Sequence, residues 1–167
     1  MMSGVRNSMV TSLISGSTIL LAGQETLMPI NAWQQAQDQE ATVITTVPSW
    51  LEILSRAGNR LTTAESLRQV LVTGSPLKAR VRNEFTTQTG VVVGDYYGLT
   101  ETGGLCLATH TANADVALVA EKENCIGYPA GALIHIVDKG GQLVDVNQVG
   151  LLRVYSDQLM ERYLDDP

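Results

Sequence analysis

The chain has 167 residues, of which 44% are hydrophobic and 17% are charged, and its formal net charge is −6. A chain of this length and composition buries a hydrophobic core, and its apolar content excludes a disordered tail. The acidic balance, without any cluster of Lys and Arg, argues against nucleic acid as a partner.

The compartment and the relation to membranes follow from two further features. The apolar stretch at 9–22 is interrupted by Gly16 and is shorter than the roughly 20 residues that cross a bilayer, so we expect no membrane span and no membrane partner. Cys106 and Cys125 have neither metal-ligand spacing nor the density of a disulfide framework. The sequence therefore predicts a protein of the reducing cytoplasm.

The first two-thirds of the sequence alternates short apolar runs with amphipathic segments, a pattern typical of an α/β fold. Alternation of this kind implies right-handed crossovers and a mainly parallel sheet with helices on both faces. In chain order, the predicted elements are a helix at 9–15, a buried strand at 19–21, a helix at 30–40, a strand at 42–47, a helix at 49–57, a strand at 70–72, a helix at 76–89 and a strand at 91–93.

Capping patterns define two of these helices. Ser49 and Glu52 have the spacing of a capping box at the start of the first. For the second, we expect Ser75 to be the N-cap, Pro76 to lie in the first turn and Gly90 to end the helix.

The pattern changes after about residue 120. We predict a small antiparallel β subdomain there, with a strand at 132–138, a tight turn at 139–141, the partner of this strand at 142–144 and another strand at 151–155. The expected organisation is therefore an α/β subdomain over 1–119 and an incomplete β-rich subdomain over 120–167.

Two loops carry the candidate chemistry, because ligands of parallel α/β sheets bind at the carboxyl ends of strands. In the first, 73–77, Gly74 lets a flat ligand approach the backbone. The second, 94–104, combines an aromatic face for a base, a hydroxyl for a phosphate oxygen and a carboxylate for the Mg²⁺ that accompanies ATP. These residues alone predict a nucleotide or metal–phosphate site. The alternative is a glycine-rich turn whose tyrosines fill the core.

The segment YYGLTETGG follows the GSPL loop, with a helix between them, and resembles the adenylate-forming superfamily of acyl-CoA synthetases, luciferases and nonribosomal adenylation domains. The segments VPSWLEIL, CIGYPAGALIHIVDKGGQLVDVNQVGLLRV and LMERYLDDP resemble the same family in the same order. The resemblance covers nearly the whole chain, and it implies that the α/β and β-rich parts belong to a larger adenylate-forming fold.

The resemblance also implies roles for the two loops. Tyr97 would stack on adenine, the backbone of 74–76 would hold the adenine edge and Thr100 would contact the α-phosphate of ATP or AMP. Glu101 would ligate Mg²⁺, which makes Thr100 and Glu101 the catalytic residues. The full set of implied nucleotide contacts is Gly74, Ser75, Pro76, Asp95, Tyr96, Tyr97, Gly98 and Thr100.

The substrate implied by the resemblance is a carboxylic acid, whose pocket would be bordered by Trp50, Gly103, Gly104 and Leu105. Family reactions join the acid to AMP with release of pyrophosphate. A thiol then takes the acyl group, and in the full enzyme this would be coenzyme A or a carrier-protein thiol. Missing parts of the same enzyme, or an apolar surface that self-associates, are the expected protein partners.

Several parts of the family machinery are not in the sequence. The phosphate loop with its lysine would precede the chain, and the ribose-binding aspartate and the C-terminal domain with the catalytic lysine would follow Pro167. Leu151 and Arg162 also stand where the family usually has glutamate and glycine. We therefore expect a fragment of an ATP-dependent carboxylate-activating enzyme of the acyl-CoA ligase type, inactive by itself. The alternative is a noncatalytic binding or interaction module derived from that fold.

Overall fold

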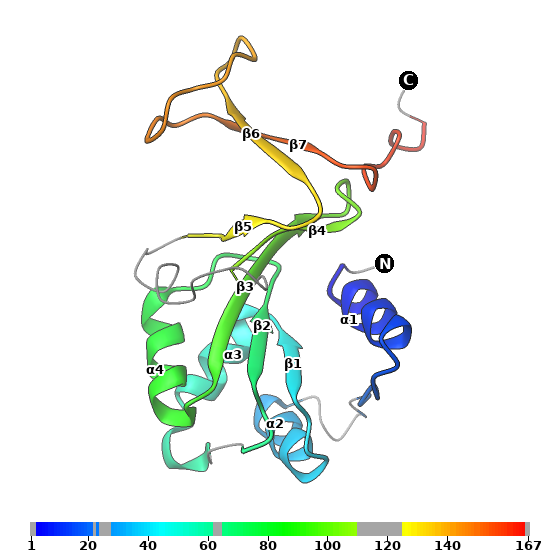
Figure 1. The fold of residues 1–167 in the computed structure, drawn as a ribbon. Coiled ribbons are helices and arrows are strands. Elements are labelled where there is room, and N and C mark those ends of the chain that lie inside the picture. The colour runs from blue at the N-terminus through cyan, green and yellow to red at the C-terminus, as the bar shows by residue number, and fades with distance from the viewer. Residues whose placement is uncertain (1–2, 22, 24–27, 62–64, 110–124, 166–167) are drawn as a thin grey trace.

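The computed structural model describes residues 3–21, 23, 28–61, 65–109 and 125–165 (Figure 1). Within these ranges the chain forms a five-stranded mixed sheet with packed helices, followed by a separate two-stranded antiparallel sheet. The predicted fold class is confirmed. None of the helices in these ranges is long and apolar enough to cross a membrane.

The first sheet has the strand order β1-β2-β3-β4-β5, in which β1, β2 and β3 are parallel, β4 is antiparallel to β3, and β5 is antiparallel to β4. The second sheet pairs β6 with β7. The elements are α1 (Ser3–Ile14), α2 (Pro29–Asp38), β1 (Val43–Thr46), α3 (Pro48–Ser55), a 3₁₀ turn (Gly58–Arg60), β2 (Gln69–Val72), α4 (Ala79–Thr89), β3 (Val92–Leu99), β4 (Gly104–Ala108), β5 (Tyr128–Pro129), β6 (Leu133–Val137) and β7 (Leu151–Tyr155).

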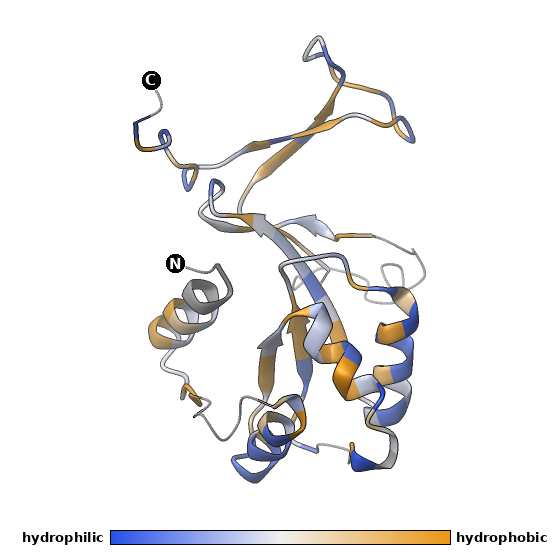
Figure 2. Ribbon diagram, turned by 180° about the vertical axis from the view of Figure 1, so that it is seen from behind, coloured by the Kyte–Doolittle hydropathy of each residue, from blue (hydrophilic) through white to orange (hydrophobic). Residues whose placement is uncertain are grey.

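The hydrophobic core lies between one face of the first sheet and the helices α2, α3 and α4. Val70 and Val72 of β2 and Val93 of β3 point toward these helices, because alternate residues of a strand share a face. The rings of Trp33 and Phe85 meet edge to face in this core, with centroids 5.4 Å apart. In Figure 2, α4 alternates hydrophobic and hydrophilic residues, as expected of a helix with one buried face.

The opposite face of the sheet is covered in part by α1, which contacts β1 and β4. The Ser8 hydroxyl donates to Thr45 Oγ1 at 3.0 Å, and Thr45 points away from the core side occupied by Ile44. Val43 and Val92 remain 44% and 37% exposed. Helices therefore lie on both faces, as predicted, but this second face is partly open.

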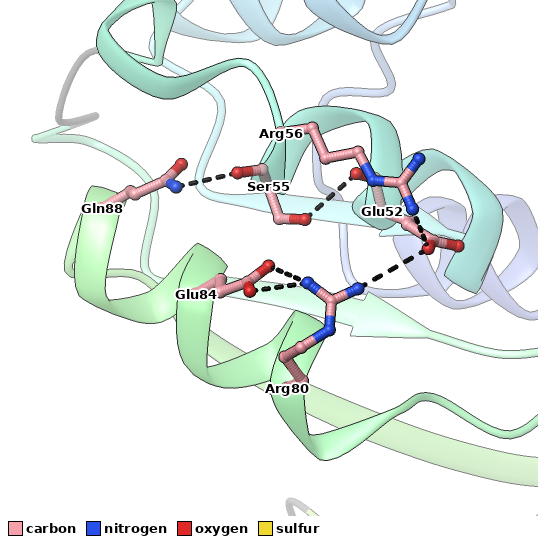
Figure 3. A network of polar contacts seen from close by, with 6 residues as sticks. All are labelled: Glu52, Ser55, Arg56, Arg80, Glu84 and Gln88. Carbon is pink, nitrogen blue, oxygen red and sulfur yellow. Dashed lines mark hydrogen bonds and ion pairs between the residues drawn. The ribbon is translucent and has the colours of Figure 1, made fainter.

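A polar network joins α3 and α4 at the surface (Figure 3). The Arg80 guanidinium lies 2.6 Å from Glu84 and 3.8 Å from Glu52, and Gln88 donates to the Ser55 carbonyl oxygen at 2.8 Å. Ion pairs as exposed as these contribute about 0–1 kcal/mol each. Burial of the apolar side chains beneath them is therefore the larger stabilising term for this helix pair.

Both predicted N-caps are wrong. The helix α3 begins at Pro48, whose fixed φ suits the first helical position, so Ser49 lies inside the helix and forms no cap hydrogen bond. The helix α4 begins at Ala79, so Ser75 and Pro76 belong to the preceding loop. The end of α4 is confirmed, since Gly90 adopts a φ of +70° there and donates its N–H to the last turn.

The predicted strand at 19–21 does not form. These residues pair with no strand in the described part of the chain, and Leu20 and Leu21 are 42% and 70% exposed. A strand needs a neighbouring strand to pair its backbone N–H and C=O groups. The sheet begins with β1 at its edge, and residues 19–21 do not pair with this edge. The apolar run that suggested burial is therefore left at the surface.

The hairpin of β3 and β4 replaces the loop predicted at 94–104. The strand β3 continues past the predicted 91–93 as far as Leu99 and pairs with β4 in antiparallel register. Its two tyrosines, Tyr96 and Tyr97, favour a pleated strand, and pairing with β4 offsets the low strand propensity of the glycines.

The second sheet follows the prediction with one change. Strands form at β6 and β7 as predicted, but β6 pairs with β7 and not with a strand at 142–144, which contributes only a single bridge between Val137 and Leu143. Tyr128–Pro129 pairs with β4 and so belongs to the first sheet. The expected boundary between 119 and 120 lies outside the described residues.

Candidate functional site

The candidate loops follow the carboxyl ends of neighbouring parallel strands. The register pairs Thr46 with Val72 and Val72 with Asp95, so β1 and β2 end level with Asp95 at one edge of the sheet, and β3 continues beyond this edge to Leu99. The loop 74–76 leaves β2 at this edge (Figure 1), and Tyr97 lies in the second half of β3. The expectation that the GSPL and YYGLTE segments share an edge is confirmed.

The turn between β3 and β4 presents Thr100 and Glu101 at its tip, where Thr100 is exposed and Glu101 is half-buried. Thr102 closes this turn from inside. Its hydroxyl oxygen accepts the Leu99 N–H at 2.9 Å and lies 3.0 and 2.9 Å from the carbonyl oxygens of Leu99 and Gly104. The side chain is 5% exposed. Thr102, to which the sequence assigned no role, therefore shapes the turn that presents the two predicted catalytic residues.

Gly98 is required by the close approach of the two strands. A Cβ at this position would lie 1.6 Å from the Gly104 carbonyl oxygen. The strand register also shifts between Tyr97 and Gly98, a bulge that bends β3 as it enters the turn. Gly98 therefore has a structural reason that is independent of any ligand.

Tyr96 and Tyr97 point to opposite faces of the sheet, as adjacent strand residues do. Tyr97 is half-buried, whereas Tyr96 is 9% exposed. Burial raises the pKa of the Tyr96 hydroxyl, and the neighbouring Thr73 side chain opposes this shift only in part. The Tyr96 oxygen has no hydrogen bond of good geometry in the described part of the chain. The two rings therefore do not face a common ligand.

Asp95 fastens β3 to α4 beneath the site. Its carboxylate is paired with the Arg82 guanidinium, which also donates to the Val93 carbonyl oxygen at 2.8 Å. The two charged side chains are only 17% and 20% exposed. Burial raises the pKa of Asp95, and this effect outweighs the opposing attraction of Arg82. The carboxylate of Asp95 is therefore already engaged within the protein.

Glu101 has two partners in the segment that follows β7. Its Oε1 accepts a hydrogen bond from the Tyr163 hydroxyl at 2.5 Å, and its carbonyl oxygen accepts the Met160 N–H at 2.9 Å. The hydrogen bond from Tyr163 holds the pKa of Glu101 below its usual value, and the same contact raises the pKa of Tyr163.

A lone carboxylate fits a magnesium–nucleotide complex better than a free metal ion. No group of three or more His, Cys, Asp or Glu side chains with metal-binding geometry occurs in the described ranges. Magnesium usually takes one or two protein carboxylates and completes its shell with phosphate oxygens and water. The donor set at Glu101 therefore fits Mg²⁺ that arrives with a nucleotide.

The residues expected to border an acyl pocket come from two places. Gly103 ends the turn, Gly104 and Leu105 begin β4, and Trp50 lies in the first turn of α3 after β1. All four lie at the carboxyl edge of the sheet, but β1 and β4 are three strand spacings apart, roughly 14 Å. A pocket between Trp50 and Leu105 would therefore span the width of β2 and β3.

The sequence matches the family described as AMP-binding enzyme over residues 1–164. The chain belongs to this family. Among curated proteins, marinolic acid–CoA ligase from Pseudoalteromonas sp. (strain SANK 73390) is 27% identical over 163 residues. The match covers 93% of this chain and 24% of that ligase, so the chain spans about a quarter of the relative's length.

Solved structures of similar fold come from longer chains. O-succinylbenzoate coenzyme A synthetase from Bacillus subtilis, solved with ATP and magnesium ion, has a TM-score of 0.81 and 23% identity, over 98% of this chain and 32% of that one. The luciferase-like enzyme from the mealworm Zophobas morio has a TM-score of 0.81 and 26% identity, over 93% of this chain and 36% of that one. The benzoate CoA ligase from Burkholderia xenovorans LB400 has a TM-score of 0.78 and 21% identity, over 93% and 30%.

Proposed function

We propose that this chain supplies the adenine-binding and magnesium–phosphate part of an ATP-dependent ligase that activates a carboxylic acid as its acyl-adenylate, of the acyl-CoA ligase type. The observation that carries the proposal is the presentation of Thr100 and Glu101 on a tightly closed turn, at the sheet edge shared with Gly74 and Tyr97. Membership of the AMP-binding enzyme family supports it.

In the proposed site, Tyr97 stacks on adenine while the backbone of 74–76 holds the adenine edge. Thr100 donates its hydroxyl to the α-phosphate, and Glu101 holds the magnesium ion. Gly98 lets the two strands close, and Asp95 and Tyr96 keep β3 in place from its two faces, through Arg82 and through burial.

The proposed reaction transfers the adenylyl group. An oxygen of the substrate carboxylate forms a bond to the α-phosphorus, the bond from that phosphorus to the bridging oxygen breaks, and pyrophosphate leaves. Bound magnesium would neutralise charge on the phosphates during this step. The acid would lie against Gly103, Gly104 and Leu105, with Trp50 at the far side of the pocket, and a thiol such as coenzyme A would accept the acyl group in the whole enzyme.

Two further features support the proposed compartment and the proposed protein partners. Cys106 and Cys125 are free thiols, which suits a reducing cytoplasm. Apolar side chains of β6 and β7 such as Leu133 and Leu151 are 58% and 61% exposed, which supports coverage of this sheet by further protein surface of the same enzyme or of a second copy.

The test is a titration of the chain with AMP, in which calorimetry measures the binding. We expect binding on the order of −4 to −5 kcal/mol, in the high micromolar to millimolar range, because stacking supplies about 1–3 kcal/mol per base. The Tyr97→Ala variant should lose this binding, whereas Tyr128→Ala, a matched change of an exposed tyrosine on β5, should retain it. Glu101→Gln should remove only the magnesium dependence of ATP binding.

Equal AMP binding by the wild type and by Tyr97→Ala would show that the adenine site is wrongly assigned. Absence of any nucleotide binding by the folded wild type would instead favour a noncatalytic interaction module built on the same fold.

A further inference from the structure

The segment 156–163, which follows β7, lies directly on the turn between β3 and β4 (Figure 1). Three contacts join them. The Met160 N–H donates to the Glu101 carbonyl oxygen at 2.9 Å, and the Tyr163 hydroxyl donates to Glu101 Oε1 at 2.5 Å. The Gln158 carbonyl oxygen lies 2.5 Å from the position that a Cβ on Gly103 would take, so only a glycine admits this approach.

This segment is also held at its beginning. The Ser156 hydroxyl donates to the Gly131 carbonyl oxygen at 3.3 Å, and it accepts the Gln158 N–H at 3.2 Å. The Leu159 N–H donates to the Ser156 carbonyl oxygen at 3.3 Å, which closes a local turn. The backbone that carries Tyr163 is therefore anchored to Gly131, two residues before β6, at one end and to Glu101 at the other.

We propose that Tyr163 is a positioning residue for Glu101, and that its hydroxyl fixes the orientation in which the Glu101 carboxylate meets a magnesium–nucleotide complex. This inference rests on the proposed function, because it takes Glu101 to be the magnesium ligand. A glutamate at the tip of a turn samples many rotamers, and a hydrogen bond to one oxygen restricts them before any ligand arrives. A carboxylate accepts several hydrogen bonds, so contact at Oε1 leaves acceptor capacity for a metal.

The opposite relation would give the opposite sign. If the Tyr163 hydroxyl competed with magnesium for Glu101, removing it would strengthen magnesium-dependent binding. Tyr163→Phe therefore separates the two, since it deletes the hydroxyl and keeps the ring.

The first arm of the experiment titrates the full chain with ATP, with and without Mg²⁺, and with AMP. In Tyr163→Phe we expect the magnesium-dependent gain in ATP affinity to fall about two- to fivefold, the size expected for loss of an exposed charged hydrogen bond. The affinities for ATP and AMP without Mg²⁺ should stay unchanged. A merely structural role would lower metal-free AMP affinity as well. Tyr155→Phe, on β7, is the matched control and should match the wild type. An unchanged or larger magnesium-dependent gain in Tyr163→Phe overturns the proposal.

The second arm needs no ligand and follows amide hydrogen exchange by NMR. In Tyr163→Phe the Met160 N–H, which donates to Glu101, should exchange about two- to fivefold faster than in the wild type, and Tyr155→Phe should show no change. In a Glu101→Ala background the Tyr163→Phe change should add nothing, because the partner of the hydroxyl is gone.

The two arms keep the two hypotheses apart. Absence of nucleotide binding by the wild type overturns the proposed function. Equal Met160 exchange in the wild type and in Tyr163→Phe overturns the positioning role of Tyr163, whatever the wild type binds.

Discussion

Within the segment 96–104, some side chains shape the turn and others face outward. Thr102 is buried, and its hydroxyl forms hydrogen bonds with the backbone of the turn. Gly98 has no side chain and so makes room for the opposite strand. Thr100 is exposed at the tip, next to Glu101. The sequence could not assign different roles to Thr100 and Thr102 from their chemistry, because both are threonines two residues apart. The family resemblance implied a role for Thr100 alone, and in the structure the closure of the turn separates the buried hydroxyl of Thr102 from the exposed side chain of Thr100.

The requirement for glycine at position 98 can be tested by Gly98→Ala. The added Cβ would meet the Gly104 carbonyl oxygen at 1.6 Å, and neither backbone can move without opening the hairpin. We expect the free energy of unfolding to fall by about 2–4 kcal/mol, measured by urea denaturation. Gly23→Ala, where a Cβ meets nothing within 4 Å, is the control and should stay within about 0.5 kcal/mol of the wild type. A Gly98→Ala variant as stable as this control would contradict the hairpin geometry.

At the scale of elements, the sequence predicted the helices and strands whose own residues carry a clear apolar pattern. The β-branched run of β1, the apolar run of β2 and the four-residue periodicity of α4 identified these elements, because each buries one face on the same core. The sequence did not predict the hairpin of β3 and β4, because its strands depend on pairing with each other more than on their own apolar content. The strand predicted at 19–21 failed for the converse reason: it has apolar content and no partner strand. The candidate site residues were predicted from their chemistry and from the family resemblance, but the contact of Tyr163 with Glu101 joins residues 62 apart in the sequence and has no local signal.

The fastening of α4 to β3 by Arg82 and Asp95 gives a prediction for pH. In Arg82→Ala, Asp95 would be left buried without its partner, and we expect a loss of about 2 kcal/mol at pH 7. Burial already raises the pKa of Asp95 above its usual value, and removing Arg82 takes away the main opposing effect, so the pKa rises further. A protonated Asp95 needs no cation. The difference between variant and wild type should therefore shrink as the pH is lowered from 7 toward 5 and below.

Urea denaturation at several pH values measures this difference. Arg80→Ala is the matched control, because Arg80 pairs with Glu84 at the surface of the same helix and is 56% exposed. Its cost should be about 0–1 kcal/mol. A cost of Arg82→Ala that is equal to that of Arg80→Ala at pH 7, or that grows as the pH falls, would contradict the role assigned to the buried pair.

At the scale of the whole molecule, the two sheets are supported very differently. The first has a core of buried side chains between its strands and three helices. The second consists of β6 and β7 alone, and most of its large apolar side chains are more than a third exposed: Leu133, Ile136, Leu151, Leu152 and Tyr155. The His135 and Tyr155 rings contact each other across it, with centroids 5.2 Å apart. An isolated two-stranded sheet is marginally stable in water, so its order in this chain depends on few contacts.

We therefore expect the two sheets to open independently. Amide hydrogen exchange followed by mass spectrometry should show β6 and β7 exchanging about tenfold or more faster than β2, whose opening requires loss of the core around Val70 and Val72. The difference arises because exposing β6 and β7 releases little buried apolar area, whereas exposing β2 releases the area shared with α3 and α4. Because segment 156–163 ties β7 to the turn at Glu101, the turn should share the faster exchange of the second sheet in part. Equal protection of β2 and of β6 and β7 would mean that the two sheets unfold as a single cooperative unit, which would contradict the prediction that they open independently.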